Sequence, residues 1–189
     1  MDARPFEAML GTFDTLVVWD YTTLEGLPAL PEDRPVEVIG WSMGVWAAGQ
    51  VLAGARVARA TAVNGTPWPI DETRGIPPAV FEGTLKGFSE AGLLRFRRRM
   101  CGGAAALKAF EAVAPERSTE ALRAELAALG EGYARLGPGN FTWDRAFAAE
   151  SDRIFPVEAQ VAAFPAAQVV PGAHWVPELF TQLLRGEEP

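Results

Sequence analysis

The chain has 189 residues, 49% of them hydrophobic, which is enough to bury one core but too little for two full domains. Its formal net charge of −7 argues against a nucleic-acid-binding protein, because neutralising phosphates requires an excess of lysine and arginine. A single cysteine excludes an intramolecular disulfide, and a single histidine makes a zinc-type site hard to build. The sequence contains neither an apolar run of transmembrane length nor a signal-peptide pattern, so we expect a soluble, cytoplasmic protein without a metal or cofactor.

In chain order, the first predicted elements are short buried strands and one helix. Apolar runs rich in β-forming residues predict strands at 15–20 and 36–40. The alanine-rich stretch 45–52 predicts a helix that packs against a sheet, and residues 58–63 predict the next strand. This succession of strand, helix and strand is typical of a parallel sheet.

The middle of the chain differs, because helix-forming residues dominate residues 71–138. Helical periodicity is clearest at 119–129, where leucines recur at i, i+4 and i+7. We therefore expect a helical lid at 71–138, inserted into a core that consists of residues 1–70 and 139–189.

After the inserted helices, strand patterns return at 145–150 and 167–170, and residues 175–185 predict a closing helix. Strands that alternate with helices on both sides of an insertion indicate an α/β fold with a mainly parallel sheet. In such sheets, functional groups gather at the carboxyl ends of the strands.

A candidate nucleophile follows the second predicted strand. Residues 40–44 read Gly-Trp-Ser-Met-Gly, the pattern G-x-S-x-G between a strand and a helix that is typical of a nucleophile elbow. Such a turn lifts the Ser42 hydroxyl clear of the sheet, and the Met43 N–H at the helix start points toward a developing oxyanion. Trp41 and Trp46 are candidates for lining an acyl pocket. A surface turn with the same pattern is the alternative, since short motifs also arise by accident.

A base and an acid follow in the order expected of an α/β-hydrolase. His174, the only histidine, lies directly after the last predicted strand and is the candidate base for Ser42. A surface histidine is the alternative interpretation. Asp152 ends the strand expected beside the histidine-bearing strand, so we expect its carboxylate to orient the imidazole. Asp144 is the alternative acid.

Basic residues are concentrated in one part of this acidic chain. Residues 85–108 contain six lysines and arginines and one acidic residue. Arg95, Arg98 and Arg99 are spaced i, i+3 and i+4, so they share one face of a predicted helix. That face is either simply solvated or attracts an anionic partner to the lid. Cys101 has no second histidine to activate it, and we interpret it as structural.

Taken together, these residues make the chain resemble the BioG-type pimeloyl-[acyl-carrier protein] methyl ester esterases, which are α/β-hydrolases of biotin synthesis. The resemblance rests on Asp20-Tyr21, WSMGVWAA at 41–48, AVNGTPWPID at 62–71, RRMCG at 98–102, DRIFP at 152–156 and Gly172-Ala173-His174. It implies hydrolysis of the distal methyl ester of pimeloyl-[acyl-carrier protein] by Ser42 and His174, with the thioester left intact. It also implies an acidic carrier protein as the partner of a basic lid, and we expect Arg95, Arg98 and Arg99 to contact that partner.

The chain departs from this family at its start. Members carry an additional apolar strand and a Gly-Trp loop ahead of the segment that corresponds to Met1, and that loop supplies the second oxyanion donor. The resemblance therefore implies an N-terminally truncated α/β-hydrolase-like fold with impaired activity. Two alternatives stay open: an esterase or thioesterase for another acyl group, and a catalytically defective protein that binds acyl-carrier protein.

Overall fold

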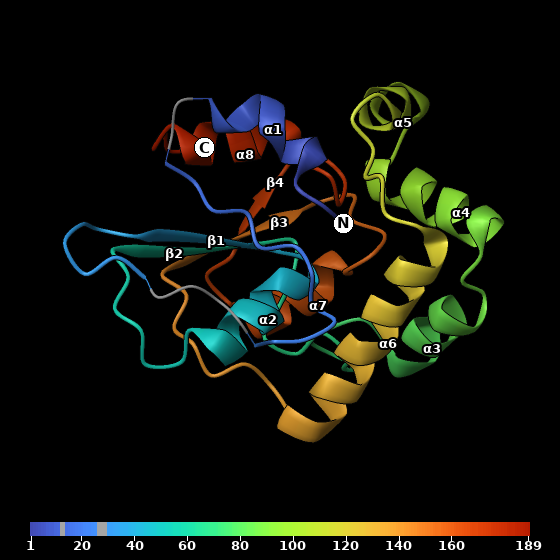
Figure 1. Cartoon of the computed structure of the whole chain (residues 1–189), viewed down its shortest axis with the longest axis horizontal. Coiled ribbons are helices and arrows are strands. Elements are labelled where there is room, and N and C mark those ends of the chain that lie inside the picture. The colour runs from blue at the N-terminus through green and yellow to red at the C-terminus, as the bar shows by residue number, and fades with distance from the viewer. Residues whose placement is uncertain (12–13, 26–29) are drawn as a thin grey trace.

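The computed structural model describes residues 1–11, 14–25 and 30–189, and its centre is a four-stranded parallel sheet (Figure 1). The strands are β1 (Glu37–Trp41), β2 (Arg59–Val63), β3 (Arg145–Ala149) and β4 (Gln168–Val170). They lie side by side in chain order. β2 and β3 are almost entirely buried, because helices cover both faces of the sheet, and this explains why their sequences are apolar throughout rather than alternating.

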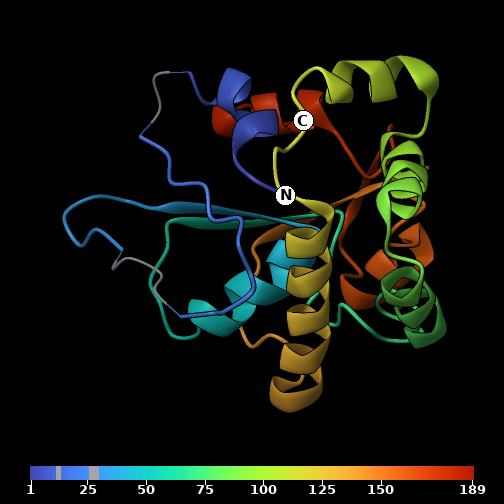
Figure 2. The same cartoon turned by 45° about the vertical axis from the view of Figure 1, so that its right-hand side comes forward.

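The two faces of the sheet are covered by different helices. On one face lie α1 (Arg4–Leu10) and α8 (Pro177–Leu184), which pack against each other. On the other face lie α2 (Met43–Val51), packed on β1, and α7 (Val157–Ala163), packed on β3 (Figures 1 and 2). The helix α2 connects β1 to β2 and α7 connects β3 to β4, as expected for parallel neighbours that need a crossover connection.

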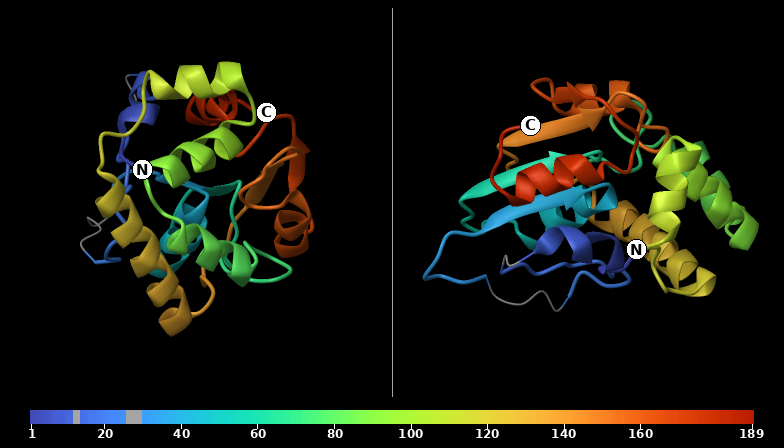
Figure 3. Two further views of the ribbon diagram at one scale, coloured as in Figure 1. Left: turned by 90° about the vertical axis from the view of Figure 1, so that its right-hand side faces the viewer. Right: turned by 90° about the horizontal axis from the view of Figure 1, so that it is seen from above.

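Four more helices lie between β2 and β3 in the sequence and stand together at the carboxyl end of the sheet (Figure 3). They are α3 (Pro78–Lys86), α4 (Glu90–Cys101), α5 (Ala104–Glu111) and α6 (Thr119–Leu136). We call them the inserted helices. All four fall within the segment 71–138, for which a lid was predicted from the sequence, and their role as a lid stays a proposal.

Capping residues set the ends of the two longest inserted helices. The Ser89 hydroxyl accepts a hydrogen bond from the Gly92 N–H at 3.1 Å and begins α4, which ends at Gly102 in a left-handed conformation. The Ser118 hydroxyl accepts from the Ala121 N–H at 3.1 Å and begins α6. In the described part of the chain, no helix combines the length and the apolar character needed to cross a membrane.

Most predicted elements are found within two residues of their predicted bounds, except that α6 continues to Leu136. The strand predicted at 15–20 is wrong. This segment is irregular, and Leu16 and Val18 are 63% and 44% exposed. A strand needs a neighbouring strand to pair its backbone groups, and in the described residues only β2 pairs with β1. The helix α1 was not predicted, because its seven residues show little periodicity.

Replacing Phe147 with alanine should destabilise the protein strongly. The Phe147 ring is 1% exposed in the main core, and such a truncation costs about 3–5 kcal/mol through lost burial and a residual cavity. Urea denaturation followed by circular dichroism measures this loss. Val169→Ala, at a position 54% exposed on β4, is the matched control and should change the free energy of unfolding by less than about 0.5 kcal/mol. Similar losses for both variants would contradict the placement of β3 in the core.

Candidate active site

Ser42 lies in the sharp turn between β1 and α2, and its backbone has a positive φ of 58°. Residues other than glycine rarely adopt such a conformation, which costs of the order of 1–3 kcal/mol and is held only by the surrounding structure. Here the Ser42 N–H donates to the carbonyl of Val63 at the end of β2, at 3.0 Å. The Met43 N–H is the first of α2, and the first N–H groups of an α-helix have no acceptor within the helix.

The two glycines of the G-x-S-x-G motif are required by close packing around this turn. A Cβ at Gly40 would lie 2.5 Å from the ring of Trp143, and a Cβ at Gly44 would lie 2.8 Å from the hydroxyl of Tyr21. Both distances are shorter than a real Cβ contact. The motif therefore has a steric basis in this chain, beyond its match to a pattern.

The structure brings Ser42, His174 and Asp152 together, although 132 and 22 residues separate His174 from the other two. The His174 Nε2 lies 2.9 Å from the Ser42 Oγ, and the Nδ1 lies 2.8 Å from an Asp152 carboxylate oxygen. The side chains of His174 and Asp152 are 1% and 0% exposed. These three predicted residues thus form one hydrogen-bonded chain that is largely shielded from water.

Further donors fix the carboxylate of Asp152. One of its oxygens accepts from the N–H groups of Ile154 at 2.7 Å and Phe155 at 3.0 Å. The other oxygen, which faces His174, also accepts from the buried Gln160 side chain on α7 at 3.1 Å. Sequence analysis missed Gln160, because a single polar residue in a short helix carries no signal of its contacts. The network holds the carboxylate in one orientation toward the imidazole.

The alternative acid, Asp144, lies at the other end of the sheet. Its carboxylate accepts from the Ala60 N–H near the start of β2, at 2.7 Å. Ser42 follows the end of β1, whereas Asp144 precedes the start of β3. Since these strands are parallel, the two residues lie at opposite edges of the sheet, and Asp144 is far from the imidazole of His174.

Trp41 and Trp46 lie outside the cavity that they were predicted to line, which corrects that expectation. The Trp41 Nε1 donates to the backbone carbonyl of His174 at 2.9 Å, and its ring centroid lies 5.2 Å from that of the imidazole. Trp46 is 1% exposed on the inner side of α2 and donates to the Gly137 carbonyl at 2.9 Å. Trp41 is the last residue of β1 and lies against the loop that carries His174, whereas the Trp46 ring packs against the Tyr133 ring of α6.

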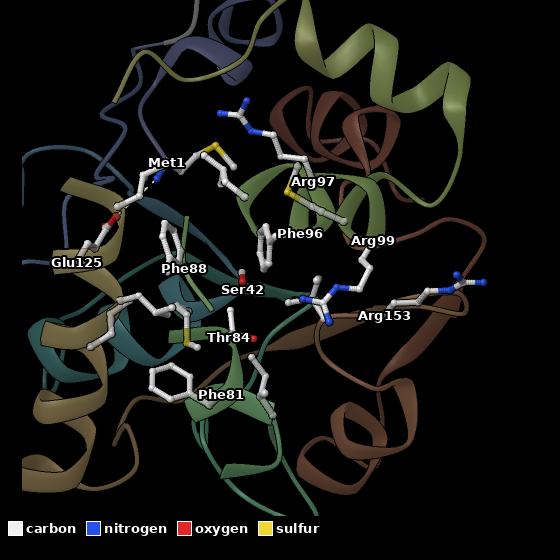
Figure 4. Close-up of a pocket in the computed structure, with 18 of the residues that line it drawn as sticks. Met1, Ser42, Phe81, Thr84, Phe88, Phe96, Arg97, Arg99, Glu125 and Arg153 are labelled. Carbon is white, nitrogen blue, oxygen red and sulfur yellow. Dashed lines mark ion pairs between the residues drawn. The ribbon is translucent and has the colours of Figure 1, made fainter. Parts of the chain in front are cut away.

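A cavity between the sheet and the inserted helices opens above Ser42 (Figure 4). Apolar side chains provide most of its lining: Met43, Ile76, Val80, Phe81, Phe88, Leu93, Phe96, Met100, Phe110, Leu122, Leu126, Leu129 and Ile154. Arg97, Arg99 and Arg153 also line it, and Arg99 and Arg153 lie on the same side in Figure 4. Among the described residues, none of these three arginines forms an ion pair with a carboxylate.

The three arginines predicted to meet an anionic partner are all exposed on α4, and of these Arg99 also lines the cavity. Cys101, at the end of the same helix, is 5% exposed, and burial raises the pKa of its thiol to about 11. A thiol that stays protonated at neutral pH is a poor nucleophile, in agreement with a structural role for Cys101.

Comparisons with known proteins place this chain in a family. The family model for BioG, described as pimeloyl-ACP methyl esterase BioG, matches residues 7–183. The chain is 46% identical over 168 residues to a Bacteroides fragilis (strain 638R) protein named malonyl-[acyl-carrier protein] O-methyltransferase, a match that covers 87% of this chain and 34% of that protein. This chain thus spans about a third of the length of that relative. It is also 36% identical over 175 residues to an uncharacterized Haemophilus influenzae protein, covering 89% of this chain and 80% of that one.

Solved structures agree with this placement. The crystal structure of BioG from Haemophilus influenzae matches with a TM-score of 0.79 and 34% identity, over 87% of this chain and 78% of that one. BpoC from Mycobacterium tuberculosis H37Rv matches with a TM-score of 0.51 and 17% identity, over 80% of this chain and 66% of that one, and shows a shared fold only. The chain has an α/β-hydrolase-class fold with a parallel sheet, and it belongs to the BioG family.

Proposed function

We propose that this protein is a serine carboxylesterase that hydrolyses the methyl ester of pimeloyl-[acyl-carrier protein] in biotin biosynthesis. The observation that carries the proposal is the hydrogen-bonded chain from Ser42 through His174 to Asp152 beneath an apolar cavity. Membership of the BioG family supports the choice of substrate.

In the proposed mechanism, the Ser42 Oγ attacks the ester carbonyl carbon while the His174 Nε2 takes the hydroxyl proton. Asp152 keeps the imidazole in the required tautomer and stabilises the imidazolium that forms. The Met43 N–H donates to the oxyanion of the tetrahedral intermediate. His174 then protonates the departing methanol, and a water molecule, activated by the same imidazole, releases the free carboxylate from Ser42.

The cavity lining favours a neutral methyl ester with a hydrocarbon chain. Apolar side chains such as Phe81, Phe96 and Met100 suit a row of methylene groups. A free carboxylate among these side chains would lose its hydration, which is costly unless it reaches one of the arginines of the lining. A neutral ester can therefore enter the apolar part of the cavity next to Ser42 at a lower cost than the free acid.

A cluster of positive charge near the cavity supports a carrier-bound substrate. Arg97 and Arg99 on α4 and Arg153 after β3 line the cavity, while Arg95 and Arg98 extend the basic surface of α4. The rest of the chain is acidic enough to bring the net charge to −7, so this basic surface is a distinct local feature. The relative from Bacteroides fragilis is itself named for O-methylation of a malonyl group on acyl-carrier protein.

Incubation with pimeloyl-[acyl-carrier protein] methyl ester tests the proposal. Mass spectrometry should show the loss of one methyl group, with release of methanol and an intact thioester. Ser42→Ala and His174→Ala should each lower the rate on the order of 10⁴-fold, because nucleophile and base act as a unit. Cleavage of the thioester would indicate a thioesterase instead. Binding of the carrier without any turnover would indicate a catalytically defective carrier-binding protein.

Asp152→Asn should lower kcat by about 10⁴-fold, because an amide at this place favours the wrong imidazole tautomer. Asp144→Asn is the matched control, since it makes the same chemical change at the far edge of the sheet. Its kcat should stay near the wild-type value in a steady-state assay with a small methyl ester. A large loss for Asp144→Asn with normal turnover by Asp152→Asn would reverse the assignment of the acid.

Replacing Arg95, Arg98 and Arg99 together with alanine should raise KM for the carrier-bound ester and leave a small free ester almost unaffected. The wild-type rate on the carrier-bound ester should also fall with added salt, because exposed charges are screened over about 10 Å at 0.1 M ionic strength. Replacing three exposed arginines elsewhere, Arg56, Arg123 and Arg135, with alanine is the control for loss of the same positive charge. Equal losses on both substrates would instead indicate damage to the inserted helices.

A further inference from the structure

A turn at the end of β2, Val63-Asn64-Gly65, contacts all three loops that carry the proposed catalytic residues. The Val63 carbonyl accepts from the Ser42 N–H at 3.0 Å. Gly65 packs so closely on the same loop that a Cβ there would lie 2.1 Å from the Ser42 carbonyl oxygen. The turn therefore holds the nucleophile loop through its backbone, and the Asn64 side chain reaches the other two loops.

The Asn64 side chain joins the loops of the acid and the base. It is 1% exposed, and its Oδ1 accepts from the Ala149 N–H at the end of β3, at 2.7 Å. The Ala149 carbonyl in turn accepts from the Asp152 N–H at 3.1 Å. The Asn64 Nδ2 donates to two consecutive backbone carbonyls, that of Ala173 at 3.1 Å and that of His174 at 2.9 Å.

The backbone conformation at position 64 favours asparagine over most other residues. Its φ of 48° lies in the left-handed region, where asparagine is the best tolerated residue after glycine. Its N–H donates to the Phe147 carbonyl of β3 at 3.0 Å. Glycine would relieve the strain but supply no side chain, whereas the position uses both the donor and the acceptor of an amide.

We propose that Asn64 is a positioning residue that fixes the backbone of His174, so that the imidazole stays aligned with Ser42 and Asp152. Asn64 touches backbone groups and not the reacting atoms. The same His174 carbonyl also accepts from the Trp41 Nε1 at 2.9 Å, so two side chains hold one oxygen. The inference rests on the proposed function in one respect, the role of His174 as the base.

Asn64→Asp is the sharpest test, because the side chain keeps its shape and its acceptor for the Ala149 N–H but presents an oxygen to the carbonyls of Ala173 and His174. With a small methyl ester, kcat should fall about 10²-fold, the size of effect that a displacement of about 1 Å produces, and KM should change little. Asn140→Asp, the same change at the exposed second asparagine, should leave kcat unchanged.

The pH dependence separates positioning from a general loss of structure. A protonated aspartic acid at position 64 regains a hydrogen that it can donate to the His174 carbonyl. Because burial beside two carbonyl oxygens disfavours the charged carboxylate, the ratio of kcat for Asn64→Asp to wild-type kcat should rise as pH falls from about 8 to about 6. A ratio that is flat or falls over this range would contradict the donor role of Asn64.

Asn64→Gly is the second variant, and it keeps the left-handed backbone without burying a carboxylate. It should lower kcat at least about tenfold, while circular dichroism shows a folded protein. The rate of labelling of Ser42 by a fluorophosphonate should fall in parallel in both variants. Because His174 is the only histidine, its imidazole Nδ1–H signal in NMR spectra can be assigned without ambiguity, and it should shift or broaden in both.

These measurements distinguish the two proposals. If wild-type protein reacts with the fluorophosphonate but hydrolyses no pimeloyl methyl ester, the proposed function fails, and labelling and NMR still test Asn64. If folded Asn64→Asp and Asn64→Gly react with the fluorophosphonate within about twofold of wild type, the positioning role is overturned. It is equally overturned if labelling falls only in proportion to the unfolded fraction, since Asn64 would then be purely structural.

Discussion

Parallel pairing between β1, β2 and β3 is the constraint on which the site depends. The register pairs Gly40 with Ala62 and Val63 with Phe147, so the loops that follow these strands leave the sheet at one edge. Short segments far apart in the sequence thereby meet at this edge, where hydrogen bonds such as that between the His174 Nε2 and the Ser42 Oγ join them. The backbone hydrogen bond from Ser42 to Val63 continues this pairing one residue beyond β1, which ties the position of Ser42 to the sheet itself.

Burial of polar groups beside an apolar cavity adds a second constraint. Asp152 is buried, and an unpaired carboxylate in such a place would be strongly destabilising. It receives hydrogen bonds from two backbone N–H groups, from Gln160 and from His174, so each of its oxygens is bonded. A fully bonded network of this kind fixes one arrangement, because any other would leave a buried group without a partner.

The sequence was sufficient to predict the three residues that meet in the structure, because few residues in this chain could serve as the base and all three lie just after predicted strands. There is one histidine, and it follows a strand, as do Ser42 and Asp152. The roles of Asn64 and Trp41 were not predictable, since both act on a carbonyl more than 100 residues away and hydrogen bonding to backbone leaves no sequence pattern. The segment 15–20 has the composition of a strand, but composition does not specify a pairing partner, and the prediction failed there.

The contacts of His174 separate the groups that position this proposed base from the groups that line the cavity. Asn64 and Trp41 hold the His174 carbonyl, while Asp152 and Ser42 face the two nitrogens of the ring. All four belong to the sheet and its loops, whereas most of the cavity lining comes from the inserted helices. Away from the end of α4, where the Met100 carbonyl accepts from the Trp175 N–H, substitutions in those helices can change the cavity lining without touching the groups that bond to His174. The sheet edge that holds His174 and the helices that provide most of the cavity lining are thus largely different parts of the chain, so the lining can vary while the geometry around His174 is maintained.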